Sequence, residues 1–374
     1  MLARLVFLFF LMMIQVSWSA PVCEDVFREK SNRSAFGSFK FSWATEELAI
    51  ATGKILFNIS PADAKPGAIL AGQTRNSPNY YFHWVRDAGI VADALLGRYK
   101  STQSSQEKET IKRKLMEYLE FSEGIQNSDT PVGLGEVKFE VDGSPYKGEW
   151  GRPQTDGPAL RAISFIHLVK TLGKENSLKS LRDRLYDGRQ PTQSLIKKDL
   201  EYIAKNWKLP SYDVWEEVKG DHFFTRMVQR RALLEGAELA KSFGDNKAAG
   251  YYEKQAREIE KTITDFWNQE DGYFVATRHQ VDGLVWDKKS NVDVAVLLGL
   301  VHGQTEDGFL KFSDPRVKAT LIKIIKTFQD QYKINQVPGV PGVAIGRYPE
   351  DQFDGPGRSG GNPWVLATLT VAEV

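Results

Sequence analysis

The stretch YYEKQAREIEKTITDF, residues 251–266, decides the fold class of this chain. Its apolar side chains step by 4, 3, 4 and 3 positions, at Tyr252, Ala256, Ile259, Ile263 and Phe266. This spacing places one apolar stripe on one face of an α-helix. The same criteria predict helices over residues 46–57, 87–96, 111–121, 158–172, 196–207, 223–243, 292–300, 321–332 and 364–374. The sequence therefore predicts an all-α fold of about ten helices, with short strands only over residues 137–141 and 273–277.

Length and composition exclude several classes of protein. Of the 374 residues, 41% are hydrophobic and 26% are charged, which are ordinary globular values that exclude intrinsic disorder and a multi-span membrane protein. The 49 Lys and Arg residues nearly balance the 48 Asp and Glu residues. Because no net field attracts phosphate or anionic lipid, we expect no nucleic-acid partner. The 9 Trp, 13 Tyr and 21 Phe residues offer flat surfaces that suit stacking on a neutral polar ligand.

The first 20 residues are typical of a cleaved export signal. Arg4 precedes an apolar run over residues 5–16, and small residues lead up to Ala20. The run is short for a membrane span, although an uncleaved anchor remains the alternative because the basic region is weak. We therefore expect residues 1–20 to be a signal peptide and the mature protein to be secreted or periplasmic, without membrane contact and with Cys23 as a free thiol.

An acidic cluster in a long loop is the sharpest chemical feature. Asp213, Glu216 and Glu217 lie within five positions, next to Tyr212 and Trp215. Three close carboxylates repel one another, so the sequence predicts a raised pKa for at least one of them. A protonated carboxyl group beside an ionised one is what cleavage of a glycosidic bond requires. The alternative is a solvated acidic turn, which is the more frequent meaning of an acidic cluster taken alone.

Three further segments supply groups that suit a sugar ligand. Residues 80–87 lead from aromatic side chains to Arg86 and Asp87, a guanidinium and carboxylate pair that can bind adjacent hydroxyl groups; the alternative is a helix cap with an ordinary ion pair. Trp150 lies between glycines, and Arg347 precedes an acidic pair. Long loops over residues 131–157, 209–221 and 337–362 hold these segments, and long loops on a helical scaffold are usually functional.

Metal and cofactor chemistry have little support in the sequence. The five histidines lack the short spacing of a zinc site: His83, His167, His222, His279 and His302. Phosphate-loop, dinucleotide and Gly-x-Ser-x-Gly motifs are absent. We therefore expect no metal and no organic cofactor.

Five motifs, in order, resemble the glucoamylases of glycoside hydrolase family 15. They are Tyr-x-x-x-Trp-x-Arg-Asp at residues 80–87, Trp-Gly-Arg-Pro-Gln-x-Asp-Gly-Pro-Ala-Leu-Arg at 150–161, Tyr-Asp-x-Trp-Glu-Glu-Val at 212–218, Gly-Arg-Tyr-Pro-Glu-Asp at 346–351 and Asn-Pro-Trp at 362–364. The resemblance runs from about residue 45 to the end. It implies an (α/α)6 barrel with six inner and six outer helices, about ten of which this chain supplies.

The resemblance also implies an activity and a set of site residues. We expect a monomer that releases glucose from the ends of starch-like α-1,4-glucans or malto-oligosaccharides with inversion; a trehalose- or dextran-type substrate is the alternative. Glu216 resembles the general acid, with Asp213 as a second catalytic or electrostatic carboxylate. The residues that resemble the substrate-binding set are Trp150, Glu217, Arg86, Asp87, Tyr80, Trp84, Arg347 and Trp364.

One part of the family pattern is missing. Inversion needs a base on the opposite face of the sugar, and the family's base lies beyond the Asn-Pro-Trp helix, where this sequence ends. Residues 21–374 are thus expected to be a catalytic domain without its last helices: a fragment of a longer enzyme, a glucan-binding relic, or an enzyme with a substitute base. We favour the fragment, because the last predicted helix ends without a cap, and expect background activity from these residues alone.

Overall fold

The computed structural model describes residues 42–76, 78–173, 184–188, 194–283, 288–340 and 342–374. Ten α-helices lie in these ranges: α2 (Ser42–Phe57), α3 (Val85–Ser101), α4 (Ser105–Gln126), α5 (Asp156–Leu172), α7 (Leu195–Asn206), α8 (Phe223–Ser242), α9 (Asn246–Thr264), α10 (Ala295–Gly303), α11 (Pro315–Gln329) and α12 (Val365–Glu373). Each overlaps a helix predicted from the sequence. The signal peptide predicted over residues 1–20, and Cys23, lie outside the described residues.

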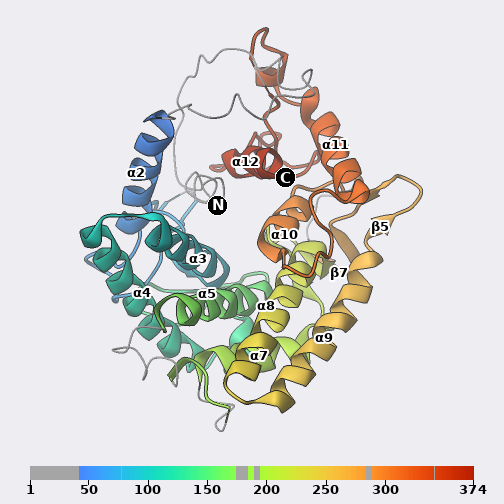
Figure 1. Cartoon of the computed structure of the whole chain (residues 1–374). Helices are drawn as coiled ribbons and strands as arrows, with labels where there is room; N and C mark the ends of the chain where they lie inside the picture. The colour runs from blue at the N-terminus through green and yellow to red at the C-terminus, as the bar shows by residue number, and fades with distance from the viewer. Residues whose placement is uncertain (1–41, 77, 174–183, 189–193, 284–287, 341) are drawn as a thin grey trace, which may run out of the picture.

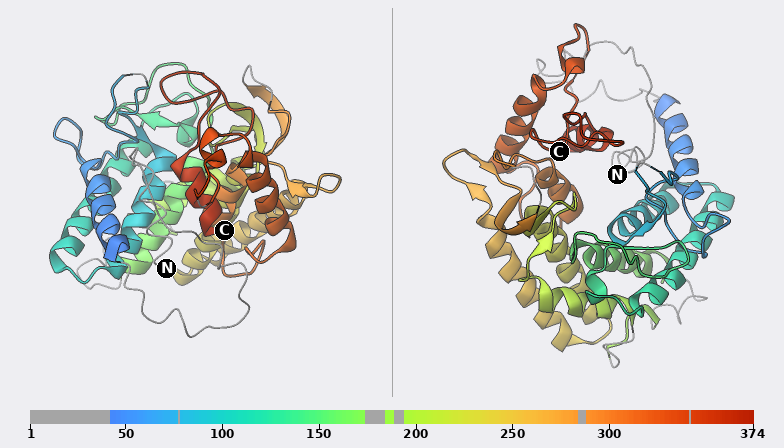
Figure 2. Two further views of the ribbon diagram at one scale, coloured as in Figure 1. Left: turned by 90° about the horizontal axis from the view of Figure 1, so that it is seen from above. Right: turned by 180° about the vertical axis from the view of Figure 1, so that it is seen from behind.

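The helices form two layers around one centre (Figure 1). Helices α3, α5, α8, α10 and α12 line the inside, and each packs against the next. Helices α4, α7 and α9 cover them from outside, together with α2 and α11 at the two sides of the opening (Figure 2). Within the described ranges, none of the helices is both long and apolar enough to span a bilayer.

The inner and outer helices differ in how much of their surface is buried, in agreement with their sequences. The inner helix α10 is almost entirely buried along AVLLGLVHG, whereas the outer helix α9 buries a single stripe that includes Tyr252, Ile259 and Ile263. An inner helix contacts protein on all sides, while an outer helix turns its charged face to water. At Gly89 on α3, a Cβ atom would lie 2.7 Å from the backbone of Leu160 on α5, so glycine permits the close approach of these two inner helices.

The strands are short and lie in the loops at one end of the barrel. Strand β1 (His83–Trp84) pairs with β2 (Lys138–Phe139), and β5 (Trp267–Asn268) pairs with β6 (Tyr273–Phe274), both antiparallel. Strands β3 (Ser211–Tyr212), β4 (Val218–His222) and β7 (Thr277–Gly283) form a three-stranded sheet in the order β3-β4-β7. The sequence located β2 and β6 but missed the other five strands, because they have two residues or, in β4 and β7, are mostly polar.

The predicted helix starts differ from the observed ones by up to six residues. The sequence also suggests Pro158 as the first residue of one helix and Asn362 as the N-cap of another, and both suggestions were wrong. Helix α5 begins at Asp156, so Pro158 is its third residue and not its first. Helix α12 has Trp364 and not Asn362 as its N-cap, because the Trp364 amide donates a hydrogen bond to the carbonyl of Ile345 at 2.8 Å and residue 364 stays extended. In both cases a loop contact, which sequence cannot show, sets the start of the helix.

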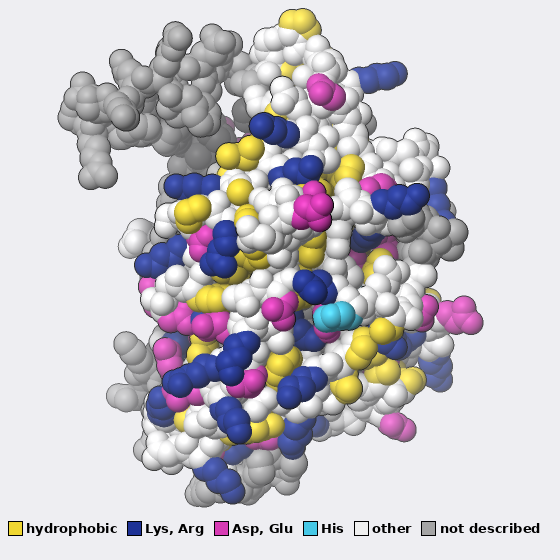
Figure 3. Space-filling view, turned by 90° about the vertical axis from the view of Figure 1, so that its right-hand side faces the viewer, with side chains coloured by type: hydrophobic (Ala, Val, Ile, Leu, Met, Phe, Trp, Pro, Cys, Tyr) yellow, Lys and Arg dark blue, Asp and Glu magenta, His cyan; other side chains and the backbone are white. Residues whose placement is uncertain are grey.

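Charges on the outer surface are mixed. Figure 3 shows Lys and Arg side chains interspersed with Asp and Glu over the face that it presents. This face has no extended region of one sign, as the near balance of charge in the sequence suggests.

Candidate active site at the barrel mouth

A tight turn between β3 and β4 presents Glu216. The side chain of Asp213 accepts hydrogen bonds from the amides of Glu217 at 2.7 Å and Val218 at 2.9 Å, and the Glu216 amide donates to the carbonyl of Asp213 at 2.9 Å. Glu216 has a φ of +66°, a left-handed conformation that a residue with a side chain seldom adopts without support. The turn is thus built by Asp213 and aims the carboxyl group of Glu216.

The carboxyl group of Glu216 accepts hydrogen bonds from three side chains that lie far away in the sequence. Oε1 accepts from the indole Nε1 of Trp84 at 2.7 Å and from Nη2 of Arg86 at 3.2 Å, while Oε2 accepts from Nε1 of Trp150 at 2.7 Å. The Glu216 side chain is only 14% exposed. The structure therefore brings four of the predicted site residues together around one carboxyl group.

Arg86 is the centre of a second set of contacts. Its Nη1 atom donates to Gln154 at 2.6 Å and lies 3.3 Å from Asp156, and its Nε atom lies 3.4 Å from Asp87 Oδ2. Burial raises the pKa of both Asp87 and Asp156, although the positive charge of Arg86 acts to lower it. Within the described chain, Oδ2 of Asp87 and Oδ1 of Asp156 are buried and accept no hydrogen bond, so their charge is compensated mainly by Arg86.

Lys138 joins the site from β2, and sequence reasoning missed it. Its Nζ atom lies 3.2 to 4.5 Å from the centres of four aromatic rings: Phe82, Trp84, Tyr146 and Trp150. Burial lowers the pKa of Lys138 to about 8, and the nearby charge of Glu216 opposes the shift. The predicted strand over residues 137–141 was the available signal, because pairing of β2 with β1 sets Lys138 opposite Trp84. Tyr80 lies beside Trp84, with the ring centres 6.2 Å apart.

Glu217 faces a different group of side chains. Its Oε1 atom lies 2.9 Å from Nη2 of Arg347, and its Oε2 atom accepts from the hydroxyl of Tyr348 at 2.7 Å. Arg347 is itself held by Asp351 at 2.5 and 2.7 Å and lies 5.3 Å from the ring of Trp364. Glu216 and Glu217, adjacent in sequence, thus belong to two clusters, one around Arg86 and one around Arg347.

The sequence predicts a raised pKa for at least one carboxyl group of the acidic cluster, and Asp213 is not that group. Burial opposes ionisation of Asp213, but Lys288 Nζ at 3.0 Å and the amides of Glu217 and Val218 outweigh it and hold the pKa of Asp213 below its ordinary value. The sequence could not show this, because Lys288 is 75 residues away. Outside this cluster, burial raises the pKa of Asp87 and Asp156, and it raises the pKa of Asp293 to about 6.

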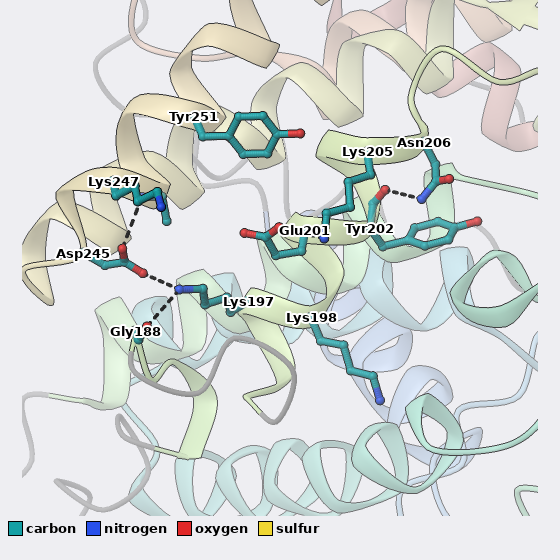
Figure 4. Close-up of a pocket in the computed structure, with 11 residues that line it drawn as sticks. Gly188, Lys197, Lys198, Glu201, Tyr202, Lys205, Asn206, Asp245, Lys247 and Tyr251 are labelled. Atoms are coloured by element: carbon teal, nitrogen blue, oxygen red, sulfur yellow. Dashed lines mark hydrogen bonds and ion pairs between the residues drawn. The ribbon is translucent and has the colours of Figure 1, made fainter.

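A separate hollow of about 690 Å³ lies on the outside between α7 and α9 (Figure 4). None of the residues around Glu216 lines it. Two of its lysines are paired with carboxylates: Lys197 contacts Asp245 as well as the carbonyl of Gly188, and Lys205 lies 3.3 Å from Glu201. We therefore assign the chemistry to the Glu216 cluster, where buried polar groups converge. The described residues also contain no group of three side chains suited to hold a metal ion.

Comparisons with known proteins identify the family of this chain. A family model described as "Glycosyl hydrolases family 15" matches residues 52–374. The chain is 34% identical over 365 residues to a glucoamylase of Blastobotrys adeninivorans, covering 94% of this chain, and 36% identical over 335 residues to glucoamylase 1 of Rhizopus oryzae, covering 89%. A solved glucoamylase from Saccharomycopsis fibuligera superposes with a TM-score of 0.79 at 30% identity and covers 89% of this chain and 72% of its own.

These findings confirm the predicted fold, which the described residues present as a partial (α/α)6 barrel. The chain belongs to family 15 of the glycosyl hydrolases. It spans 58% and 54% of the length of the Blastobotrys and Rhizopus relatives. Another relative, 30% identical, is an intracellular, sporulation-specific glucoamylase of Saccharomyces cerevisiae.

Proposed function

We propose that the Glu216 site hydrolyses terminal α-1,4-glucosidic bonds of starch-like glucans and releases glucose, with Glu216 as the proton donor. The main support for the proposal is the set of hydrogen bonds that Glu216 accepts from Trp84, Trp150 and Arg86. The side chain of Glu216 is only 14% exposed. General acid catalysis needs such a fixed and largely desolvated carboxyl group next to the leaving oxygen. The relatives named as glucoamylases support the same substrate class.

The groups around Arg86 suit the terminal sugar. Arg86 can donate to one hydroxyl group while the carboxylate of Asp87, 3.4 Å from Arg86, accepts from the adjacent hydroxyl group. The ring of Trp150, 39% exposed, offers a face for the apolar side of the next sugar. Tyr80 and Trp84 complete the wall beside the clamp.

The Arg347 cluster suits the other side of the same sugar. We assign Glu217 to hydroxyl binding rather than to proton transfer, because Arg347, Tyr348 and Lys288 already hold both of its oxygens. Trp364 lines this cluster beside Arg347.

Inverting hydrolysis also needs a carboxylate base that can hold a water molecule on the opposite face of the sugar. Asp213 is unsuited to that role, because two amides occupy Oδ1 and Lys288 binds Oδ2. We therefore assign Asp213 to building the turn and to electrostatics, and we expect the base from a carboxylate outside the Glu216 turn.

We extend the proposal to location and assembly: the protein acts as an exported monomer. The apolar segment over residues 5–16 supports export.

The test is glucose release from maltotriose by the protein expressed from its complete coding sequence. Glu216→Gln keeps the shape of the side chain but removes the acid, so glucose release is expected to vanish while binding, followed by tryptophan fluorescence, persists. Glu270→Gln, on the exposed turn between β5 and β6, is the matched control. Wild-type rates in Glu216→Gln would remove the assignment, and glucan binding without turnover by the wild type would identify a binding protein. Parallel assays on trehalose and dextran decide the alternative substrates.

A further inference from the structure

Lys288 lies under the acidic turn and touches three carboxyl groups at once. Its Nζ atom lies 3.0 Å from Asp213, 3.2 Å from Glu217 and 3.5 Å from Asp293, and 4.0 Å from the centre of the Tyr348 ring. The Lys288 side chain is only 11% exposed. A lysine this enclosed needs compensating charge, and here the three carboxylates outweigh burial and raise the pKa of Lys288.

These contacts connect the turn to the start of α10. Asp213 and Glu217 belong to the turn, whereas Asp293 lies just before α10 and accepts from the Ala295 amide at 2.8 Å. Asp293 also accepts from the indole of Trp215, the residue before Glu216, at 2.9 and 3.0 Å. Lys288 therefore bonds to the turn on one side and to a fixed point of the inner helical layer on the other.

We propose that Lys288 is a positioning residue for the hydrolysis proposed above, because it bonds Asp213 and Glu217 together and so fixes the turn that presents Glu216. The inference rests on the proposed function for its effect on rate. Lys288 itself makes no contact with Glu216 among the described interactions, so its influence passes through the turn.

Two physical arguments indicate that the turn needs the Lys288 side chain. Asp213, Glu217 and Asp293 are all buried, and removing the cation between them would leave like charges in a poorly solvated space, which forces protonation or separation. The left-handed backbone of Glu216 persists only when its surroundings hold it. Loss of Lys288 weakens the hold on Asp213, whose Oδ1 atom binds the two amides that close the turn.

The test compares Lys288→Met with Lys288→Arg and with Lys289→Met, which removes the exposed neighbouring lysine. In Lys288→Met we expect kcat to fall by roughly a hundredfold, the size expected when a reacting group is displaced by about 1 Å. Lys288→Arg should recover most of the rate, and Lys289→Met should match the wild type. All rates are compared at a temperature at which circular dichroism shows each variant folded.

The pH profile separates positioning from general support of the fold. The charged and titratable groups that face Lys288 are Asp213, Glu217, Asp293, Tyr348, Arg347 and His222. Lys288 helps to hold the pKa of Asp213 below its ordinary value. Without the lysine charge, Asp213 takes up a proton at higher pH, so the acid limb of kcat/KM should move to higher pH in Lys288→Met. A purely structural role would lower stability and leave this limb in place.

Hydrogen exchange makes the test independent of turnover. The amides of Glu217 and Val218, bonded to Asp213, should lose protection in Lys288→Met and keep it in Lys289→Met. If the wild type proves inactive but Lys288→Met still loses amide protection, the proposed reaction is wrong, whereas the role of Lys288 in fixing the turn is supported. A folded Lys288→Met with wild-type protection, rate and acid limb would overturn the inference.

Discussion

The indole Nε1 atom of Trp150 lies 2.7 Å from Oε2 of Glu216, although 66 residues separate them in the chain. Trp84 makes the equivalent contact with the other carboxyl oxygen from a third segment. The two rings lie edge to face, with centres 6.1 Å apart. The acid is therefore oriented by paired indole donors, and this arrangement can be tested one donor at a time.

We expect Trp150→Phe to lower kcat/KM for maltotriose by roughly ten- to a hundredfold, because one hydrogen bond to a charged group contributes about 1.5–3 kcal/mol. Phenylalanine keeps an aromatic face for the sugar but has no N–H donor, so the loss reports the hydrogen bond. Trp267→Phe, which removes an indole donor to Gln269 on the exposed β5–β6 turn, is the control. An unchanged rate in Trp150→Phe would show that the contact does not orient the acid.

The sequence predicted the helices well because their signal is local. The stripe from Tyr252 to Ile263 needs only its own spacing to specify an outer helix, and α9 buries those positions. The left-handed Glu216 and the three-stranded sheet carry no comparable signal. Their stability comes from contacts across the fold, so neither spacing nor propensity could reveal them.

The site residues also fall into those that the sequence could predict and those that only the structure shows. Motifs marked Glu216, Arg86 and Trp150 as members of one site, but only through resemblance to a family. Lys138 and Lys288 belong to no motif, and their roles depend on the rings and carboxylates that the fold brings around them. A lysine's function is set by its environment, and the environment of each lysine is assembled from segments far apart in the chain.

The buried ion pair between Arg161 on the inner helix α5 and Asp199 on the outer helix α7 should stabilise the packing of α7 against α5. Two hydrogen bonds of 2.6 and 2.8 Å join the groups, which are 2% and 0% exposed. We expect Asp199→Asn to lower the free energy of unfolding by about 3–5 kcal/mol, because it leaves a buried guanidinium without its counter-charge. Urea unfolding followed by circular dichroism measures the change. The exposed pair of Glu258 and Lys261 on α9 supplies the control Glu258→Gln, which should leave the midpoint in place; equal effects would contradict the role of burial.

His167 on α5 should make stability depend on pH, because it joins three inner helices. Its ring nitrogens bond to Asp93 on α3 and, at 2.7 Å, to Glu235 on α8, and Arg231 lies 3.3 Å from it. Burial acts to lower the pKa of His167, but the two carboxylates outweigh burial and raise it. The stabilisation is fully present below the ordinary histidine pKa of about 6.5 and is lost as pH rises through the raised value.

Thermal midpoints of the wild type should therefore fall as the pH is increased from about 6, close to the ordinary histidine pKa, into the alkaline range. His167→Gln should flatten this slope, whereas His279→Gln, at an exposed histidine, should keep it. A His167→Gln variant with the wild-type slope would exclude this cluster as the source.

Lys138 should titrate within its aromatic surroundings near neutral pH. Because burial lowers its pKa to about 8, the lysine loses its proton near that pH and leaves the ring of Trp150, 3.2 Å away, without a neighbouring cation. We expect a step in intrinsic tryptophan fluorescence centred near that pH, since the positive charge interacts with the indole ring. Lys138→Met should lack the step, and Lys147→Met, at an exposed lysine of the same loop, should retain it. A step that survives in Lys138→Met would assign the titration to another group and remove Lys138 as the cation that faces the Trp150 ring.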